Sequence, residues 1–304
     1  MRWSIRCGFV LMLTPLAFAP AGPTRADLDS ATAAYYEQRF DDAAKEFKTL
    51  AEAGDPQAQS WLGYLYQMGE GVPQDHAEAM RLYRQAAQQG NAAAQNYIGD
   101  LYYYGRGVPS DFPESVRWYR LAADGGSAAG QVSLGYAYEM GEGVDKDVTE
   151  AARWYRAAAE QGSAVGQNNL GNLYHYGRGV TQDYAEAERW YRAAVAQNNS
   201  YAQLNLGDMY YHGAGVAQDY AEAARLYRLS ADQGNPRGQY ALGYVYESGE
   251  GVARDDAQAL RWYQLSAEQG QTDASEAAQR LTAAGVAATE AAPASTAPTT
   301  TTST

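Results

Sequence analysis

The sequence predicts an all-α solenoid built from helix-turn-helix repeats. Six glycines recur at intervals of 36 residues, with no insertion or deletion between them: Gly63, Gly99, Gly135, Gly171, Gly207 and Gly243. Around each glycine, a helical pattern, a Gly-x-Gly-Val loop and a second helical pattern follow in the same order. A fixed period of this length is typical of proteins in which each unit buries its apolar face only against its neighbours. We therefore expect the function to lie on a surface.

Residues 1–26 are interpreted as an export signal. Arg2 precedes an apolar run over residues 7–18, and small residues follow it. This run is too short to span a bilayer, so we expect cleavage after Ala26 and a mature protein that is periplasmic or secreted. Cleavage after Ala19 is the alternative, although Pro20 would then follow the cut.

The composition of the mature chain excludes several classes of function. Cys7 is the only cysteine and lies in the predicted signal, so no thiol remains for a disulfide, a metal or nucleophilic catalysis. Beyond residue 26 there are 20 basic and 36 acidic residues, a net charge of −16. Such an acidic surface disfavours nucleic acid and anionic lipid as partners. No other segment is apolar enough to span a membrane.

The chain divides into five predicted segments. After the signal, residues 27–54 predict a shorter helix pair close to a tetratricopeptide repeat, and residues 55–270 hold the six full repeats. Residues 271–286 predict a capping helix with a polar outer face. Residues 287–304 are rich in alanine, proline and threonine, which predicts a disordered tail.

The ends of the helices have their own signals. Each second helix is predicted to begin after an aspartate, with Glu or Gln three residues later, the pattern of a capping box. These aspartates are Asp75, Asp111, Asp147, Asp183, Asp219 and Asp255. Each second helix is predicted to end at a residue in the left-handed conformation, a place that favours glycine or asparagine. These residues are Gly54, Gly90, Gly126, Gly162, Asn198, Gly234 and Gly270.

Two recurring features have both a structural and a ligand-binding interpretation. Glycine-rich loops such as residues 69–72 can hold phosphate, but a phosphate-binding loop follows a strand, and both segments that flank these loops are predicted helices. We therefore favour an inter-helix turn. An arginine also recurs three residues after the Glu or Gln of each predicted capping box, from Arg81 to Arg261. This spacing on a helix predicts Glu–Arg surface pairs rather than a ligand-binding ladder.

These motifs resemble the Sel-one-like repeat family, relatives of the tetratricopeptide repeats. The matching residues of one repeat are Leu170, Gly171, Tyr174, Gly177, Gly179, Val180, Asp183, Ala187, Trp190 and Tyr191. The resemblance covers residues 55–270 and implies a right-handed superhelix that serves as a protein-interaction scaffold. Exported bacterial members are implicated in signalling regulation, envelope assembly and secretion. A cysteine-rich branch is linked to β-lactam or cell-wall binding, but its disulfides are absent here, so that role is not carried over.

The first helix of each repeat has two sides on a helical wheel. Ala58, Gln59, Leu62, Gly63 and Tyr66 share one side and their equivalents recur, which predicts packing positions. The opposite stripe falls at positions 57, 60, 64, 67 and 68 and at 36-residue steps beyond them, and its residues vary. In tetratricopeptide-like solenoids this face lines the concave groove.

The stripe is rich in tyrosine, asparagine and acidic residues, which suit recognition of a peptide or a glycan. The predicted partner-binding residues are Asn96, Asp100, Tyr103, Tyr104, Tyr136, Glu139, Asn168, Asn172, His175, Tyr176, Asp208, Tyr211, His212, Tyr240 and Tyr244. The competing interpretation is that the tyrosines only seal one repeat against the next. Tyr104, Tyr136 and Tyr176 are predicted to be the hot spots, because hot spots are commonly aromatic and central. The neighbouring acids predict a basic or amide-rich partner.

The sequence predicts no catalytic residues, no metal and no cofactor. His175, Asp208 and His212 could together bind zinc, but no tight ligand motif is present, so a polar groove is favoured. No Ser-His-Asp or Cys-His arrangement is indicated. The sequence therefore predicts an exported scaffold or regulator, not an enzyme, that binds a protein or peptide in its concave groove. The alternatives are an envelope factor that binds cell-wall glycan and a metal-dependent enzyme.

Overall fold

The computed structural model describes residues 25–288, and these residues form fifteen helices and no strand. None of these helices is long and apolar enough to cross a membrane. All but the last two residues of the predicted signal, and all but the first two of the predicted tail, lie outside the described range. The chain divides between Gln89 and Gly90 into two compact units, which we describe separately.

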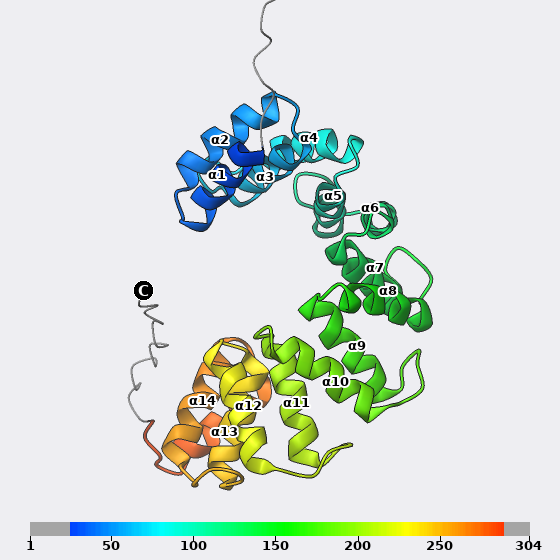
Figure 1. Ribbon diagram of the computed structural model, residues 1–304. Helices are drawn as coiled ribbons and strands as arrows, with labels where there is room; N and C mark the ends of the chain where they lie inside the picture. The colour runs from blue at the N-terminus through cyan, green and yellow to red at the C-terminus, as the bar shows by residue number, and fades with distance from the viewer. Residues whose placement is uncertain (1–24, 289–304) are drawn as a thin grey trace, which may run out of the picture. The chain divides into compact units, whose positions relative to one another are not determined.

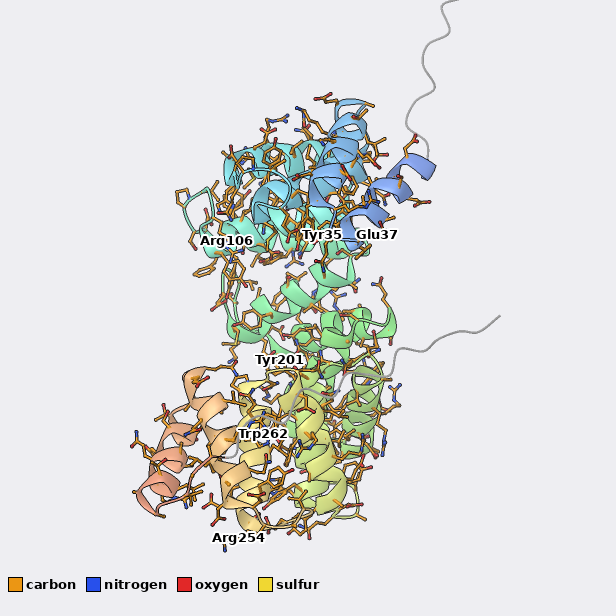
Figure 2. The ribbon with its side chains drawn as sticks, turned by 90° about the vertical axis from the view of Figure 1, so that its left-hand side faces the viewer. Tyr35, Glu37, Arg106, Tyr201, Arg254 and Trp262 are labelled. Carbon is orange, nitrogen blue, oxygen red and sulfur yellow. The ribbon has the colours of Figure 1, made fainter. Side chains whose placement is uncertain are left out.

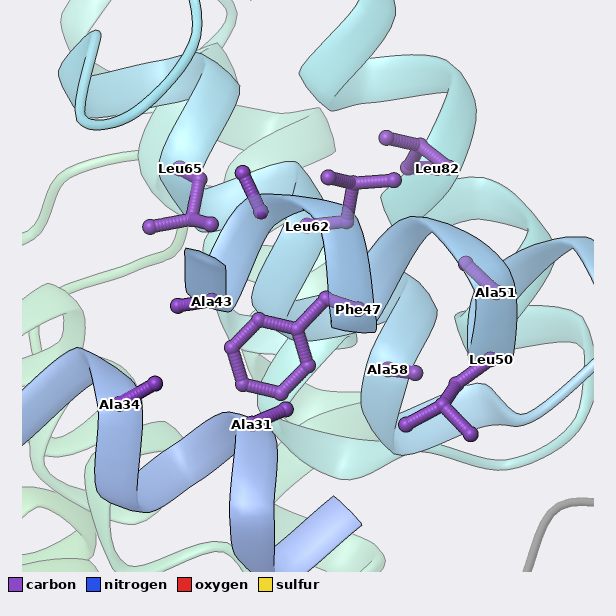
Figure 3. Close-up of a cluster of buried hydrophobic side chains, with 11 residues drawn as sticks. Ala31, Ala34, Ala43, Phe47, Leu50, Ala51, Ala58, Leu62, Leu65 and Leu82 are labelled. Atoms are coloured by element: carbon purple, nitrogen blue, oxygen red, sulfur yellow. The ribbon is translucent and has the colours of Figure 1, made fainter. Parts of the chain in front are cut away.

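Unit 1 contains the helices α1 (Arg25–Tyr36), α2 (Phe40–Glu52), α3 (Pro56–Met68) and α4 (His76–Gln88). The first two lie where the sequence predicts a shorter helix pair. Phe47 of α2 is fully buried in a cluster to which α1, α3 and α4 all contribute (Figure 3). Its ring stacks on that of Trp61, with 5.6 Å between the ring centroids. Alanines on the facing side of α1 let that helix approach closely.

Unit 2 is a run of stacked helix pairs (Figure 1). Its helices are α5 (Ala92–Tyr104), α6 (Phe112–Asp124), α7 (Ala128–Met140), α8 (Val148–Glu160), α9 (Ala164–Tyr176), α10 (Tyr184–Val195), α11 (Ser200–His212), α12 (Tyr220–Asp232), α13 (Pro236–Ser248), α14 (Asp256–Glu268) and α15 (Thr272–Ala283). Each odd-numbered helix up to α13 is the first helix of a repeat, and it packs on the second helix that follows it. The predicted helical repeat solenoid is therefore confirmed within the unit.

Four of the five positions predicted to pack are buried in the fourth repeat, and the fifth, Tyr174, is half-buried. Leu170 has no exposed surface, and Gly166 and Gly171 beside it on α9 are buried as well. Gln167 is buried with its hydrogen bonds satisfied: its side-chain amide donates to the carbonyl of Ala159 at 3.2 Å, and its side-chain oxygen accepts from Gln197 at 2.8 Å. Gln167, the polar residue on the packing side of the helix, therefore has a structural role, because a buried amide without partners would be unfavourable.

The predicted caps are confirmed, with one difference. The side chain of each of the six aspartates accepts a hydrogen bond from the first turn of the following helix; Asp183, for example, accepts from the amides of Ala185 and Glu186 at 3.0 and 3.1 Å. The return half of a capping box is not made, because the amide of Asp183 donates to the carbonyl of Tyr174 at 3.0 Å. Glu186 is thereby free to pair with Arg189 at 2.7 Å. The same Glu–Arg pairing recurs in four other repeats.

The left-handed residues at the ends of the second helices are also confirmed. All six predicted glycines have φ between 81° and 96°, and Asn198 takes the same role with φ 62°. The two glycines of the loop have different structural roles. Gly177 is the left-handed C-cap of α9. Gly179 is also left-handed, and a Cβ placed on it would lie 2.3 Å from the carbonyl oxygen of Val148, at the start of the second helix one repeat earlier. The second glycine is therefore needed because the loop packs directly on neighbouring backbone.

This difference predicts two distinct costs for the same substitution. Gly162→Ala meets no atom within 4 Å, so it should cost only the left-handed strain, about 1–2 kcal/mol of unfolding free energy. Gly179→Ala has the same strain and also collides with backbone, so it should cost about a further 1–3 kcal/mol. Chemical denaturation of the two variants beside the wild type measures both. Equal costs would contradict the packing role of the loop glycine.

Candidate functional site

The first helices of unit 2 form a continuous layer. In this layer α5 contacts α7, α7 contacts α9, α9 contacts α11 and α11 contacts α13, whereas each second helix mainly contacts its own first helix and the next one. The predicted partner-binding stripe lies on this layer. We call the exposed side of α5, α7, α9, α11 and α13 the first-helix face.

The structure separates the predicted stripe into buried and exposed members. Asn96 and Asn168 are 7% exposed and belong to the interior. Most tyrosines expected at the surface are found there, since 41 to 63% of the surface of each is accessible: Tyr104, Tyr136, Tyr176, Tyr201 and Tyr244. The stripe is therefore narrower than the helical wheel predicts, because neighbouring first helices cover one edge of it.

Four of the eight predicted polar residues, Asp100, Glu139, Asn172 and Asp208, accept a hydrogen bond from a buried tyrosine. Each second helix contributes one such tyrosine, and its hydroxyl donates to a side chain of the first helix of the same repeat. The pairs are Tyr83 to Gln67 (2.9 Å), Tyr119 to Asp100 (2.8 Å), Tyr155 to Glu139 (2.9 Å), Tyr191 to Asn172 (2.7 Å), Tyr227 to Asp208 (2.8 Å) and Tyr263 to Glu247 (2.9 Å). These acceptors thus have a structural role that the sequence analysis did not assign to them.

The carboxylates of the stripe are correspondingly not free surface charges. Burial raises the pKa of Asp100 to about 6 and also raises the pKa of Asp208. Glu139 is paired with Arg178 at 3.1 Å. The prediction of a basic partner depends on these three acids, and each of them has an internal partner.

The tyrosines at the fourth position after the repeat glycine reach across to the next repeat. Tyr103 donates to Glu142 at 2.7 Å, and its ring lies 6.5 Å from that of Tyr136. In the same way Tyr211 donates to Glu250, and its ring lies 6.1 Å from that of Tyr244. For Tyr103 and Tyr211 the sealing interpretation of the tyrosines therefore describes the geometry.

His175 occupies the equivalent position in the fourth repeat. Its ring packs against Tyr176 and Tyr184, at 4.6 and 5.3 Å between centroids, and its buried Nδ1 atom has no hydrogen-bond partner in the described structure. Burial lowers its pKa, although the carboxyl group of Asp208 acts in the opposite direction. Residues 25–288 hold no group of three or more His, Cys, Asp or Glu side chains placed to hold a metal ion.

Two exposed tyrosines carry an arginine on the ring. The guanidinium carbon of Arg106 lies 4.9 Å from the ring centre of Tyr104, and that of Arg178 lies 5.7 Å from the ring centre of Tyr176. Both arginines stand between the two glycines of the inter-helix loop. Positive charge therefore borders the two tyrosines that the sequence analysis places among acidic residues.

A pocket of about 470 Å³ lies on the first-helix face near the C-terminal end of unit 2. Its lining comes from α11, α12, α13 and the start of α15, and comprises Leu204, Asp208, Tyr211, His212, Tyr227, Arg237, Tyr240, Ala241, Tyr244, Gln271 and Asp273. Five of the predicted site residues meet in it, and they come from the last two repeats. The predicted hot spots Tyr104, Tyr136 and Tyr176 are not among its lining.

Three polar residues of this pocket, Arg237, Gln271 and Asp273, are not among the residues predicted from the sequence. A signal for Arg237 was present, because the equivalent positions of the other five repeats hold uncharged residues: Gln57, Ala93, Ala129, Val165 and Tyr201. Gln271 and Asp273 follow the last repeat, so the periodicity gives no expectation for them. Only the packing of α15 on α14 brings them to the pocket.

The fold and the tyrosine-lined face define an α-solenoid of helix-turn-helix repeats. The Sel1 repeat matches six consecutive segments, residues 56–91, 92–127, 128–163, 164–199, 200–235 and 236–271. The chain belongs to the Sel1 repeat family. Proteins of this family generally mediate protein–protein interactions and are typically non-catalytic scaffolds.

The solved structures that are similar to this chain include two with at least 30% sequence identity. A Sel1 repeat protein from Oxalobacter formigenes is 30% identical with a TM-score of 0.72, over 80% of this chain and 97% of the other. A protective antigen of uropathogenic Escherichia coli strains, described as displaying an SLR fold, is 36% identical with a TM-score of 0.64. That match covers 86% of this chain but only 59% of the antigen. No protein of curated function matches the chain.

The raised pKa of Asp100 predicts how stability depends on pH. An aspartate in the unfolded chain has a pKa of about 3.9, and the folded value is about 6. The folded protein therefore holds the proton more tightly, and the stability from Asp100 is full below pH 4 and is lost as pH rises through 6.

Asp100→Asn keeps an acceptor for Tyr119 but removes the titration. Its unfolding free energy should decrease less than that of the wild type between about pH 4 and 6, by at most about 3 kcal/mol, because only the contribution of Asp100 is removed and that of Asp208 remains. Urea denaturation across this range tests it, with the exposed Asp124→Asn as the matched control. A pH profile for Asp100→Asn that is identical to the wild-type profile would show that Asp100 is not buried as described.

Proposed function

We propose that this protein is a non-catalytic scaffold or regulator that binds a protein or peptide partner on the first-helix face of unit 2. The observation that carries the proposal is the pocket between α11, α13 and α15, where exposed Tyr244 and half-buried Tyr240 meet polar side chains. Protein interfaces concentrate their binding energy in such aromatic anchors, which give a large contact area at low entropic cost.

The remaining exposed tyrosines extend the proposed contact along the face. Tyr104, Tyr136 and Tyr176 lie on α5, α7 and α9, and each is more than two-fifths exposed. A partner anchored in the pocket could contact them only if it is long, because they belong to earlier repeats. This favours a protein or an extended peptide over a small molecule.

A cell-wall glycan is the second candidate. Aromatic rings beside planar polar side chains such as Gln271, Asp273 and Arg237 offer the stacking and hydrogen bonding that sugars use. The same variants test both candidates when binding to isolated peptidoglycan is measured beside binding to protein.

We also propose that the protein is exported. The support is the basic and apolar pattern of residues 1–26. N-terminal sequencing of the protein from its native host should find a chain that starts near Asp27 in the periplasmic or secreted fraction. A cytoplasmic protein that retains Met1 would contradict the proposal.

The binding proposal predicts a different effect for two double variants. Tyr244→Ala with His212→Ala removes two of the exposed side chains of the pocket, and Tyr136→Ala with Tyr176→Ala removes the central rings predicted from sequence. Partners are first identified by crosslinking in cells and mass spectrometry, and affinity is then measured by calorimetry with the purified partner. We expect the pocket variant to weaken binding by roughly 30-fold or more, the effect of losing a hot spot.

Circular dichroism and melting temperature serve as controls, since all four side chains are exposed. A loss of affinity only in the Tyr136/Tyr176 variant would move the site to the centre of the face. If both folded variants bind the partner with unchanged affinity, the first-helix face is not the binding surface.

A further inference from the structure

Arg237 is a charged residue without a bonded partner in the pocket. It is exposed, and its guanidinium group makes no hydrogen bond or ion pair with any residue in the described range. Its charge acts at longer range on Asp208, where it lowers the pKa of that carboxyl against the larger opposite effect of burial. By contrast, the five Glu–Arg pairs on the second helices satisfy their arginines locally.

The position of Arg237 is unfavourable for the helix that carries it. It follows the N-cap Asn235 and Pro236 in the first turn of α13. A cation near a helix N-terminus is repelled by the positive end of the helix dipole. The other five repeats place an uncharged residue here. A residue that breaks a local rule without a structural gain is a candidate functional residue.

The other polar groups of the pocket divide into engaged and available ones. The hydroxyl of Tyr227 donates to Asp208, and that of Tyr211 donates to Glu250. The hydroxyl of Tyr240 and the side-chain amide of Gln271 have no hydrogen-bond partner among the described residues. His212 is exposed at the pocket and its ring also makes no hydrogen bond in the described structure. Together with Arg237 these side chains are four available donors in one pocket, and they favour a ligand that carries a carboxylate.

The walls of the pocket set a second requirement. Tyr244, Ala241 and Leu204 give it apolar surface, so the group beside the carboxylate must be apolar or aromatic. Asp273 is exposed at the same pocket, and the whole chain has a net charge of −13, so a segment with several negative charges is repelled. An Asp or Glu residue carries its carboxylate in place of an apolar side chain. Only the C-terminal residue of a chain carries an apolar side chain and a carboxylate together.

We propose that the pocket binds the C-terminal residue of a partner chain. In this inference, which rests on the proposed function, Arg237 and the Tyr240 hydroxyl bind the α-carboxylate, and the apolar side chain of that residue packs against Tyr244 and Ala241. Capture of a terminal carboxylate is an established mode of peptide recognition. A pocket of about 470 Å³ is large enough for one residue and part of the next.

The test uses fluorescent peptides and the full-length mature protein. The probes are pentapeptides Gly-Ser-Gly-Ala-X that end in each of the twenty amino acids as the free acid, with the matched C-terminal amides. A further amide peptide, Gly-Ser-Gly-Leu-Glu-amide, offers the carboxylate from a side chain. Fluorescence polarisation measures affinity for the wild type, Arg237→Gln, Tyr240→Phe and Arg254→Gln. Arg254 lies in the loop between α13 and α14 (Figure 2), pairs with Asp256 at 2.9 Å and does not line the pocket, so Arg254→Gln matches the charge change.

We expect free acids with an apolar or aromatic X to bind the wild type, and their amides to bind roughly 10- to 100-fold more weakly, the effect of losing a charge-assisted hydrogen bond. Arg237→Gln should weaken the free acids by a similar factor and leave the amides unchanged, whereas Arg254→Gln should change neither. Tyr240→Phe should weaken the free acids by a smaller factor.

Three results would overturn the inference. The first is equal affinity for acids and amides, the second is binding of the glutamate amide as tightly as the best free acid, and the third is a panel in which no peptide binds more tightly than about 1 mM. In each case the proposal that a protein or peptide binds the first-helix face is tested separately, by the affinity of the Tyr244/His212 double variant for the partner identified by crosslinking. Loss of that partner together with failure of the peptides would leave the pocket as a binding site with a different ligand chemistry.

Discussion

The contact between a glycine of the first helix and a tyrosine of the second helix is the constraint on which each repeat depends. A Cβ added to Gly171 would stand 2.7 Å from the ring of Tyr191, and the equivalent glycines are similarly close to their tyrosines. The two helices of a repeat approach so closely because the glycine leaves room for a flat ring. The ring is buried, so its hydroxyl must find an acceptor inside the repeat. The acceptor in turn fixes a polar residue on the first helix.

The choice of acceptor links the interior to the surface. In three repeats the acceptor is the residue directly after the repeat glycine, as Asp208 follows Gly207. The fourth residue after the glycine then carries an aromatic ring, as Tyr211 does. In the other three repeats the acceptor is the fourth residue after the glycine, such as Glu247, and the residue directly after the glycine is a tyrosine, such as Tyr244. The pattern of exposed rings on the first-helix face is therefore partly set by an internal hydrogen bond.

Local charge on this face differs from the net charge of the chain. The protein is acidic overall, yet the carboxylates of the stripe accept internal hydrogen bonds, and two of them have raised pKa values because they are buried. Arginines stand on the rings of Tyr104 and Tyr176, and Arg237 has no bonded partner. Net charge describes the long-range field of the whole molecule. The chemistry of a pocket depends on the few groups that remain available within it.

The sequence by itself determined the repeat, its helix boundaries and its packing positions. These follow from local rules: Asp183 caps a helix, Asn198 turns the chain and Leu170 faces its neighbours whatever the wider context. Only the tertiary structure decided which polar residues are free to bind. A helical wheel places Asp100 on the exposed side of its helix, whereas in the structure its carboxyl group accepts a hydrogen bond from Tyr119, which is 19 residues away in the sequence. The pocket likewise depends on α15, which lies outside the repeats, because a surface is made by residues that are distant in sequence and no periodic pattern records their contacts.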